Sequence, residues 1–216
     1  MILLDRVTKV YPVRGGGLRT LVRDLTAVIH RGDALAILGR NGAGKSTLMR
    51  MLAGVEYPTS GRIERRMSVS WPLAHGLGIQ SSLSGADNTR FVARIYGMPV
   101  EPMVRFVAEF SELGPYLYMP VRTYSAGMMG RLTFGMSLAV DFDCYLIDEG
   151  ASAGDVRFVN RAREALTAKL RNRTIIMVSH NVADVRSFCR TGAVLHGGTL
   201  TFFEDLDEAI ATYESL

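Results

Sequence analysis

The sequence predicts an α/β fold with a β-rich N-terminal part and an inserted helical lobe. Apolar residues alternate over 2–11 and again over 25–39, which indicates strands near the N-terminus. Near the C-terminus, the apolar runs 143–148 and 173–180 enclose a helical segment, and a β-α-β unit of this kind implies parallel strands. Between these parts, from about residue 85 to 139, the spacing of apolar residues is helical. We therefore expect a parallel α/β core interrupted by helices.

The remaining elements follow in order along the chain. Residues 46–53 carry helical spacing directly after the second strand region, and residues 57–64 form a turn that leads into another strand. In 102–113, apolar residues repeat at three-to-four spacing, as on one face of a helix. Residues 160–172 are the helix between the two C-terminal strands, and 205–216 form a final amphipathic helix.

Length and composition indicate an ordinary globular protein. The chain has 216 residues, of which 48% are hydrophobic and 21% charged, which fits one domain with an inserted lobe. No apolar stretch reaches the ~18 residues of a membrane-spanning helix. Two cysteines, Cys144 and Cys189, favour packed thiols in a reducing, cytoplasmic compartment over a disulfide framework. We interpret the net charge of +4, and the cluster Arg62, Arg65 and Arg66, as solvated surface and not as a nucleic-acid site.

A P-loop pattern, GRNGAGKST, follows the strand ALAIL and opens a helix, which is the context that this pattern requires. Its glycines let main-chain N–H groups surround phosphate oxygens at the start of a helix. Lys45 reaches the β and γ phosphates, and Ser46 is a Mg²⁺ ligand. A Gly-rich structural turn is the alternative, but it would not require a Lys-Ser pair in register. The predicted nucleotide-binding residues here are Gly39, Asn41, Gly42, Ala43, Gly44, Lys45, Ser46 and Thr47.

Two acidic residues and a histidine follow strands of the predicted parallel sheet. Asp148 and Glu149 leave the strand CYLI, and His180 follows the strand TIIMVS. Because the carboxyl ends of parallel strands share one edge, these side chains should face the P-loop. Asp148 suits Mg²⁺, Glu149 suits a general base or a residue that orients water, and His180 can reach a γ-phosphate. Taken alone, the acidic pair could equally cap the next helix, and a lone histidine is more often structural.

A small-residue turn, TYSAGM, opens the helical stretch MGRLTFGMSLAV. Ser125 and Gly127 could present free N–H groups to a second anion, although by itself the turn is better explained as a helix cap.

With these motifs in this order, nearly the whole chain resembles the ATPases of ABC transporters. GRNGAGKST resembles the Walker A motif, YSAGM the signature, CYLIDE the Walker B motif, ASAGD the D-loop with Asp155, and SH the switch histidine. The resemblance implies a RecA-like P-loop NTPase core with the inserted lobe of the ABC type. It also implies that Tyr11 stacks on adenine, where an ordinary strand aromatic is the alternative, and that Gln80 is the Q-loop glutamine beside Mg²⁺. The predicted catalytic residues are Lys45, Glu149 and His180.

Some segments narrow the family further. SWPLAHGLGIQSSLSGADNTRFVARIYG, TYSAGMMGRLTFGMSLA and YLIDEGASAGD resemble the ATPases of capsular and related polysaccharide exporters, although Ala126 and Met128 replace the usual glycine and glutamine of the signature. The resemblance implies one ABC ATPase domain, residues 1–216, with a core of about 1–84 and 140–216 and a lobe of about 85–139. No appended glycan-binding domain is expected.

The resemblance further implies ATP and Mg²⁺ as cofactors and a nucleotide-sandwiched homodimer. Its expected partners are an integral membrane permease and further envelope export components, with no nucleic acid, at the cytoplasmic face of the inner membrane. Exporters of O-antigen or of teichoic-acid-type polymers remain alternatives for the cargo. A soluble ABC ATPase acting on ribosomes or DNA is a further alternative, but it would usually carry two P-loops or long coiled-coil arms. The signature argues against an unrelated P-loop kinase or GTPase.

Overall fold

The computed structural model describes the chain except for residues 14, 74–77 and 149–155. It divides into two compact units. The first unit comprises Met1–Pro72, Phe142–Glu149 and Asn172–Leu216, and the second comprises Leu73–Asp141 and Gly150–Arg171.

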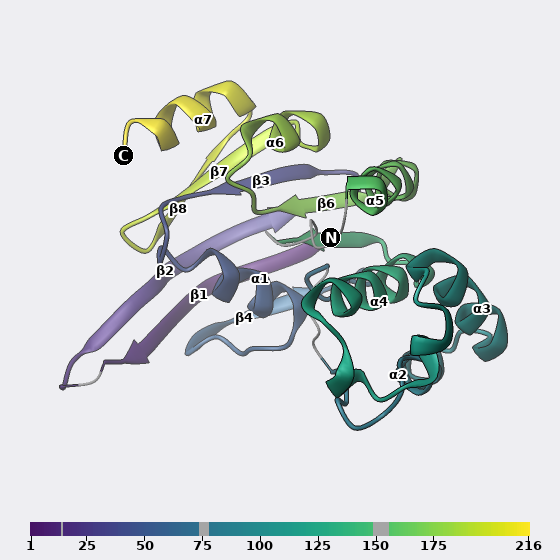
Figure 1. Cartoon of the computed structure of the whole chain (residues 1–216). Coiled ribbons are helices and arrows are strands. Elements are labelled where there is room, and N and C mark those ends of the chain that lie inside the picture. Colours follow the sequence, from purple (N-terminus) through teal and green to yellow (C-terminus); the bar gives the residue numbers. More distant parts are fainter. Residues whose placement is uncertain (14, 74–77, 149–155) are drawn as a thin grey trace. The chain divides into compact units, whose positions relative to one another are not determined.

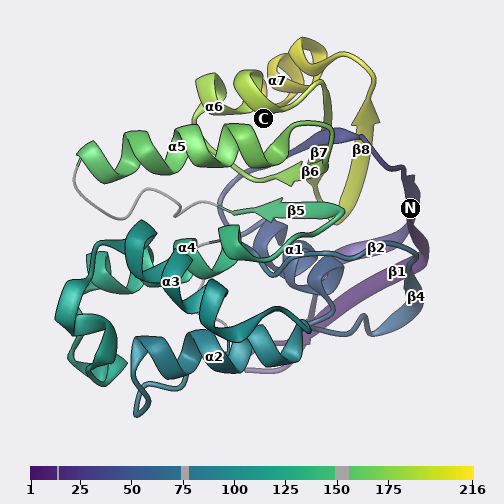
Figure 2. The same cartoon turned by 90° about the vertical axis from the view of Figure 1, so that its right-hand side faces the viewer.

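A five-stranded sheet in the first unit has the order β5-β6-β3-β7-β8. Its strands are β3 (Ala34–Leu38), β5 (Cys144–Ile147), β6 (Thr174–Met177), β7 (Thr191–His196) and β8 (Thr199–Phe203). All neighbours pair in parallel except β7 and β8, which form an antiparallel pair at one side. The predicted parallel β-α-β arrangement of the C-terminal strands is therefore confirmed, because β5 pairs directly with β6 (Figure 2).

A second, three-stranded sheet in the same unit has the order β2-β1-β4 and is antiparallel. Its strands are β1 (Ile2–Pro12), β2 (Leu18–Ile29) and β4 (Ser60–Arg65), so the predicted β-rich N-terminal part is present (Figure 1). Three helices complete the unit: α1 (Lys45–Ala53), α6 (Val182–Phe188) and α7 (Leu206–Glu214). The core lies where both sheets meet α1, and it includes the fully buried Val7, Met49, Leu146 and Leu195. Burial of these side chains provides the main drive for folding.

Helix α1 has clear end signals. Its last turn is followed by Gly54 at φ 78, a left-handed C-cap that suits glycine. The main-chain carbonyls of Met51 and Leu52 accept hydrogen bonds from the guanidinium of Arg65. The prediction that Arg65 belongs to a solvated edge was therefore wrong, because this side chain satisfies carbonyl groups that the helix end leaves free. Arg62 and Arg66 are exposed, as predicted.

The second unit is helical. It consists of α2 (Gly85–Ile95), α3 (Val100–Ser111), the 3-10 turns η1 (Gly114–Tyr118) and η2 (Val121–Thr123), α4 (Ala126–Ala139) and α5 (Val156–Leu170). Aromatic rings pack in its interior: Phe110 stacks on Phe134 at 5.9 Å between centroids and meets Phe158 edge-on at 5.7 Å. This unit takes in 73–84 and α5, which the sequence assigned to the core, so the expected boundaries of the lobe differ from this division.

Other expectations concern the thiols and the membrane. Cys144 and Cys189 are free and buried, and burial raises the pKa of each thiol to about 12, which confirms packed thiols. Within the described part of the chain, no helix combines the length and the apolar character that a membrane span requires.

Candidate functional site

The P-loop lies between the end of β3 and the start of α1, and its glycines meet two different demands. A Cβ on Gly39 would lie 2.6 Å from the carbonyl oxygen of Leu195 in β7, so the close approach of the neighbouring strand excludes a side chain there. Gly44, immediately before α1, has φ +109, a conformation that side chains rarely adopt. The sequence context predicted for the motif, strand then loop then helix, is thus present.

Lys45 is held inside the loop that it follows. Its Nζ donates hydrogen bonds to the carbonyls of Gly39, at 2.5 Å, and Arg40, at 3.2 Å, and only 8% of the residue is exposed. A buried ammonium needs such acceptors, because removing it from water is costly otherwise. Two carbonyls of the P-loop therefore hold the ammonium against the loop.

A pocket of about 540 Å³ opens beside this loop. That volume falls within the range of small-molecule sites, ~300–1,000 Å³. Of the predicted site residues, the pocket brings together Tyr11, Asn41, Gly42, Gly44, Lys45, Ser46, Thr47, Asp148 and His180. The further lining residues are Pro12, Val13, Arg19, Leu21 and Val178. The chemistry assigned to these residues stays a prediction.

Sheet order explains why the predicted acid and histidine reach the P-loop pocket. β6 lies between β5 and β3, and all three strands run in parallel. Their carboxyl ends lead into Asp148, His180 and Gly39, so the expectation that these three ends share one edge of the sheet is confirmed. Asp148 is 5% exposed, whereas His180 is exposed to solvent. Glu149 and Asp155, also predicted from sequence, lie outside the described residues.

Tyr11 belongs to a charged cluster that the sequence did not predict. Its hydroxyl donates to Glu56, which also forms ion pairs with Lys9 at 2.8 Å and Arg50 at 3.0 Å. Burial alone would raise the pKa of Glu56, but hydrogen bonds from Lys9, Tyr11 and Arg50 outweigh it and lower the pKa to about 2. Arg50 also donates to Thr47 of the P-loop helix. The cluster thus connects the tyrosine to α1, and no spacing in the sequence could have indicated it.

The predicted residues of the helical unit have their own local geometry. Ser125 is the N-cap of α4, and its hydroxyl accepts a hydrogen bond from the N–H of Met128 at 3.2 Å. A Cβ on Gly127 would meet nothing closer than the Ser125 hydroxyl at 3.9 Å, so packing in this chain does not require the glycine. Space of this kind allows another group to approach the main chain at the start of α4.

Gln80 is fixed through its main chain. Its N–H donates to the side-chain oxygen of Asn88, and its carbonyl accepts from the Asn88 amide at 3.0 Å. Asn88 is 1% exposed, and we did not predict it from the sequence. The exposed side chain of Gln80 therefore projects from a segment that is held at both main-chain polar groups.

The fold and this pocket define a class of protein. A P-loop between a parallel strand and a helix, with a carboxylate at the end of another parallel strand of the same sheet, is the arrangement of a P-loop nucleotide-binding α/β protein. A family model described as "ABC transporter" matches residues 22–152. The chain belongs to the ABC transporter family, which confirms the predicted fold class and the predicted ABC-type ATPase.

The chain is also similar to individual proteins of this family and to solved structures. The chain is 49% identical over 216 residues, 100% of both chains, to the capsule polysaccharide export ATP-binding protein CtrD of Neisseria meningitidis serogroup B. It is 38% identical to the teichoic acids export ATP-binding protein TagH of Staphylococcus haemolyticus, over 88% of this chain and 74% of the relative. An ATP-binding cassette solved as a dimer in a post-hydrolysis state with ADP and Pi has a TM-score of 0.77. That match covers 95% of this chain and 99% of the other at 20% identity, and it supports the fold.

Proposed function

We propose that this chain is the ATP-hydrolysing subunit of an ABC exporter that moves capsular polysaccharide across the inner membrane through a separate permease. The observation that carries the cargo assignment is the full-length similarity to CtrD. The shorter and weaker match to TagH makes teichoic-acid-type polymers the second candidate.

The pocket supplies the groups that nucleotide binding needs. Lys45 would pair with the β and γ phosphates while the N–H groups of the P-loop surround them. Tyr11, which also lines the pocket, would stack on the adenine ring. His180 would donate to the γ-phosphate, where negative charge develops during hydrolysis. Together these contacts hold the triphosphate in a fixed geometry, which is the main contribution that a protein makes to phosphoryl transfer.

Oxygen donors in the pocket suit Mg²⁺. The hydroxyl of Ser46 and the carboxylate of Asp148 both line it, and Mg²⁺ prefers such ligands together with retained water and phosphate oxygens. We assign these two residues, with Gln80, to the metal. When bound, Mg²⁺ supplies charge neutralisation for the β and γ phosphates. Glu149 is proposed to orient and deprotonate the attacking water, and Asp155 to act from the D-loop.

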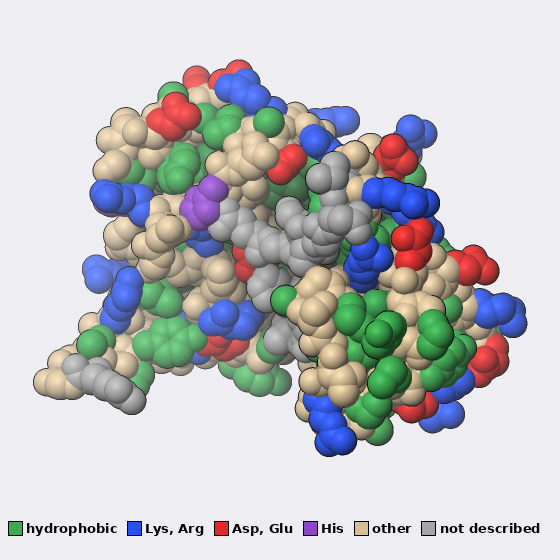
Figure 3. Space-filling model, viewed as in Figure 1, with side chains coloured by type: hydrophobic (Ala, Val, Ile, Leu, Met, Phe, Trp, Pro, Cys, Tyr) green, Lys and Arg blue, Asp and Glu red, His purple; other side chains and the backbone are tan. Residues whose placement is uncertain are grey.

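A membrane partner is proposed for the helical unit. Figure 3 shows hydrophobic side chains gathered over the helical elements on one face. Exposed apolar patches of this kind mark interaction sites. In the described part of this unit, the exposed large apolar residues are Leu83, Phe91, Ile95, Tyr96, Phe106, Tyr116, Tyr118 and Met119. We propose that this unit docks to the permease at the cytoplasmic face of the membrane, that two copies act as a homodimer, and that further envelope components complete the export path.

The proposed function is tested in cells that lack this protein. The wild-type chain should restore capsular polysaccharide at the surface, and Lys45→Ala should not, because the variant cannot hold the triphosphate. We expect the ATPase activity of the purified variant to fall at least ~100-fold, the effect of removing one donor that stabilises charge in a transition state. Lys169→Ala is the control, since Lys169 pairs with Asp141 in the helical unit. Restoration of the surface polymer by Lys45→Ala would contradict the proposal.

The competing functions give different results in the same strain. A surface loss confined to a polymer other than the capsule would favour the second cargo. For a ribosome-associated or DNA-associated ATPase, the tagged protein should copurify with those particles. For an exporter subunit, it should copurify with an integral permease from detergent-solubilised membranes.

A further inference from the structure

Besides Tyr11 and apolar residues, the β1–β2 hairpin contributes a charged residue to the pocket, Arg19, directly opposite Tyr11. Antiparallel pairing places Tyr11 across from Arg19 and Pro12 across from Leu18. Directly opposite residues of an antiparallel pair point to the same face. Tyr11 and Arg19 accordingly both line the P-loop pocket. The hairpin end therefore presents an aromatic ring and a guanidinium side by side.

The hairpin has the conformation that its unusual glycines predict. Gly15, Gly16 and Gly17 all have φ between +93 and +110, and a Cβ on any of them would meet nothing within 4 Å. Their value is thus conformational and not steric. Two hydrogen bonds between Val13 and the glycine turn, each 3.1 Å, close the hairpin end. The sequence PVRGGGLRT, which the nucleotide motifs do not account for, brings Arg19 back alongside Tyr11.

Arg19 makes a specific contact with the P-loop. Its Nη2 donates a hydrogen bond to the carbonyl oxygen of Gly42 at 2.7 Å. In a P-loop, the N–H groups turn inward to the anion, so a carbonyl such as that of Gly42 needs a donor from outside. A guanidinium has five N–H donors in a planar fork, and one of them serves this carbonyl. The side chain is exposed at the pocket wall, where its remaining donors can reach a ligand.

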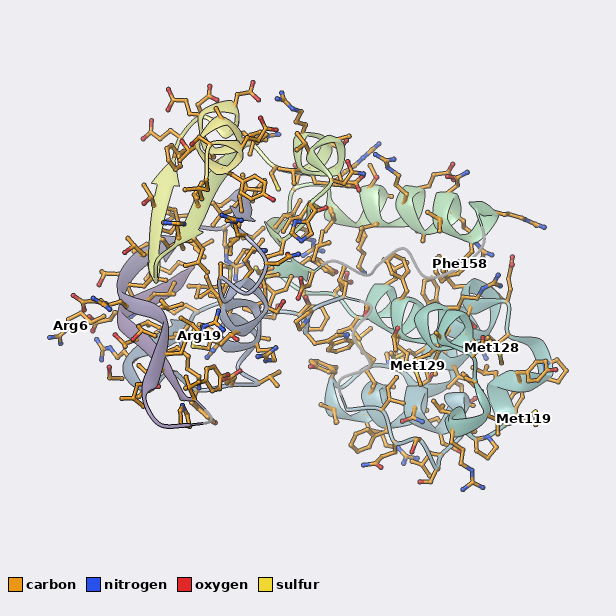
Figure 4. The ribbon with its side chains drawn as sticks, turned by 60° about the vertical axis from the view of Figure 1, so that its left-hand side comes forward. Arg6, Arg19, Met119, Met128, Met129 and Phe158 are labelled. Carbon is orange, nitrogen blue, oxygen red and sulfur yellow. The ribbon has the colours of Figure 1, made fainter. Side chains whose placement is uncertain are left out.

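The charged residues that line the pocket suit an anionic ligand. Among the described residues that line the pocket, Lys45 and Arg19 are cations and Asp148 is an acid, so two cations are available to a ligand that carries several negative charges. Arg6 on the same sheet provides a contrast: its side chain is 78% exposed and pairs with Asp5. Figure 4 shows Arg6 pointing away from the molecule and Arg19 beside the segment that leads into α1.

We infer that Arg19 is a phosphate-binding residue of the nucleotide site, which anchors the P-loop at Gly42 and donates to a phosphate oxygen of the bound nucleotide. The inference rests on the proposed function, because it takes ATP as the ligand. It adds to the site a cation from a strand that carries none of the sequence motifs.

Equilibrium binding to the purified full-length chain tests this role. ATP and inorganic tripolyphosphate are each titrated in competition with a fluorescent ATP analogue. Arg19→Gln should weaken both ligands about tenfold, the effect expected of one charge-assisted hydrogen bond. Arg19→Lys, which keeps the charge but loses the fork, should weaken both about threefold. Arg6→Gln should match the wild type. Thermal unfolding without nucleotide checks that all four proteins are folded.

The outcomes separate the inference from the function on which it rests. Unchanged affinities for Arg19→Gln in a chain that binds ATP would overturn the inference alone. A loss for ATP without a loss for tripolyphosphate would also overturn it, because Arg19 would then act on the nucleoside end through the hairpin. Failure of the wild type to bind ATP would overturn the proposed function itself.

Discussion

At the scale of single residues, three interactions converge on the carboxylate of Glu56. Lys9, Arg50 and the Tyr11 hydroxyl all contact it, and its side chain is 19% exposed. Lys9 also lies 4.9 Å from the centre of the Tyr11 ring, in a cation–π contact. An acid with several donors is stabilised in its ionised form, and its replacement leaves those donors without a charge partner. Glu56 therefore couples the strand that carries Tyr11 to the helix of the P-loop.

This cluster predicts how stability depends on pH. The pKa of Glu56 in the folded protein is about 2, below its ordinary value of 4.5, so the stability it contributes is present above pH 4.5 and is lost as the pH falls toward 2. Glu56→Gln should lower the free energy of unfolding at pH 7 by about 1–2 kcal/mol, after allowance for screening. The difference from the wild type should shrink across this window. Urea titrations at several pH values measure it.

A matched control is available at Glu64. This residue pairs with Arg66 at 2.7 Å, but both side chains are solvated. Glu64→Gln should leave the urea midpoint almost unchanged, since exposed pairs contribute little. If Glu56→Gln gave the same stability difference at pH 7 and at pH 2.5, the ionised form of Glu56 would not be the source of the stabilisation.

At the scale of elements, the helical unit has two kinds of contact between α3, α4 and α5. Glu112, at the end of α3, pairs with Arg161 of α5 at 2.6 Å and lies 3.8 Å from Arg131 of α4. Arg131 also makes a cation–π contact: its guanidinium carbon lies 4.9 Å from the centre of the Phe158 ring. Phe158 itself is 3% exposed and packs against Phe110 and Phe134. The three helices are therefore joined by an ion cluster around Glu112 and by an aromatic layer of Phe110, Phe134 and Phe158.

We expect the aromatic layer to contribute more to the stability of the helical unit than the ion cluster does. Phe158→Ala should destabilise the protein by about 3 kcal/mol, the cost of removing a large buried side chain. Glu112→Gln should cost about 0.5 kcal/mol, because all three charged groups reach solvent. Hydrogen exchange of α4 and α5 amides in both variants measures the difference locally. Equal losses of protection, or a greater loss in Glu112→Gln, would show that the ion cluster dominates.

Some residues of the site could be predicted from the sequence, and others could not. The P-loop could be identified because its residues are contiguous, and Asp148 and His180 could be placed because parallel strands share an edge. Arg19 and Glu56 could not, since their roles depend on hairpin pairing and on contacts between distant segments. Arg65 was misassigned because composition does not show that its partners are the last carbonyls of α1. The helical unit extends beyond 85–139 because α5 packs on its aromatic core.

At the scale of the whole molecule, the proposed chemistry needs donors from more than one side of the γ-phosphate. Lys45 and the P-loop cover one side of the triphosphate, and charge that develops during transfer calls for a second set. The start of α4 offers such a set, because Ser125 caps it and Gly127 leaves the main chain open to approach. We propose that this turn acts on the nucleotide of a second, identical chain. A twofold axis would then produce two equivalent composite sites.

Mixed dimers of differently tagged chains test this arrangement. In the trans dimer, one chain carries Lys45→Ala and the other Ser125→Arg. In the cis dimer, one chain carries both changes and the other is wild type. If sites are composite, both lesions of the trans dimer fall in one site and the other stays intact, so about half of the wild-type ATPase activity should remain, one site of two. The cis dimer should then be inactive, because each of its sites contains one lesion.

Sites formed within single chains give the reverse: an inactive trans dimer and a half-active cis dimer. Because both dimers contain the same two substitutions, general destabilisation cannot produce a difference between them, and a half-active cis dimer beside an inactive trans dimer would exclude the sandwich.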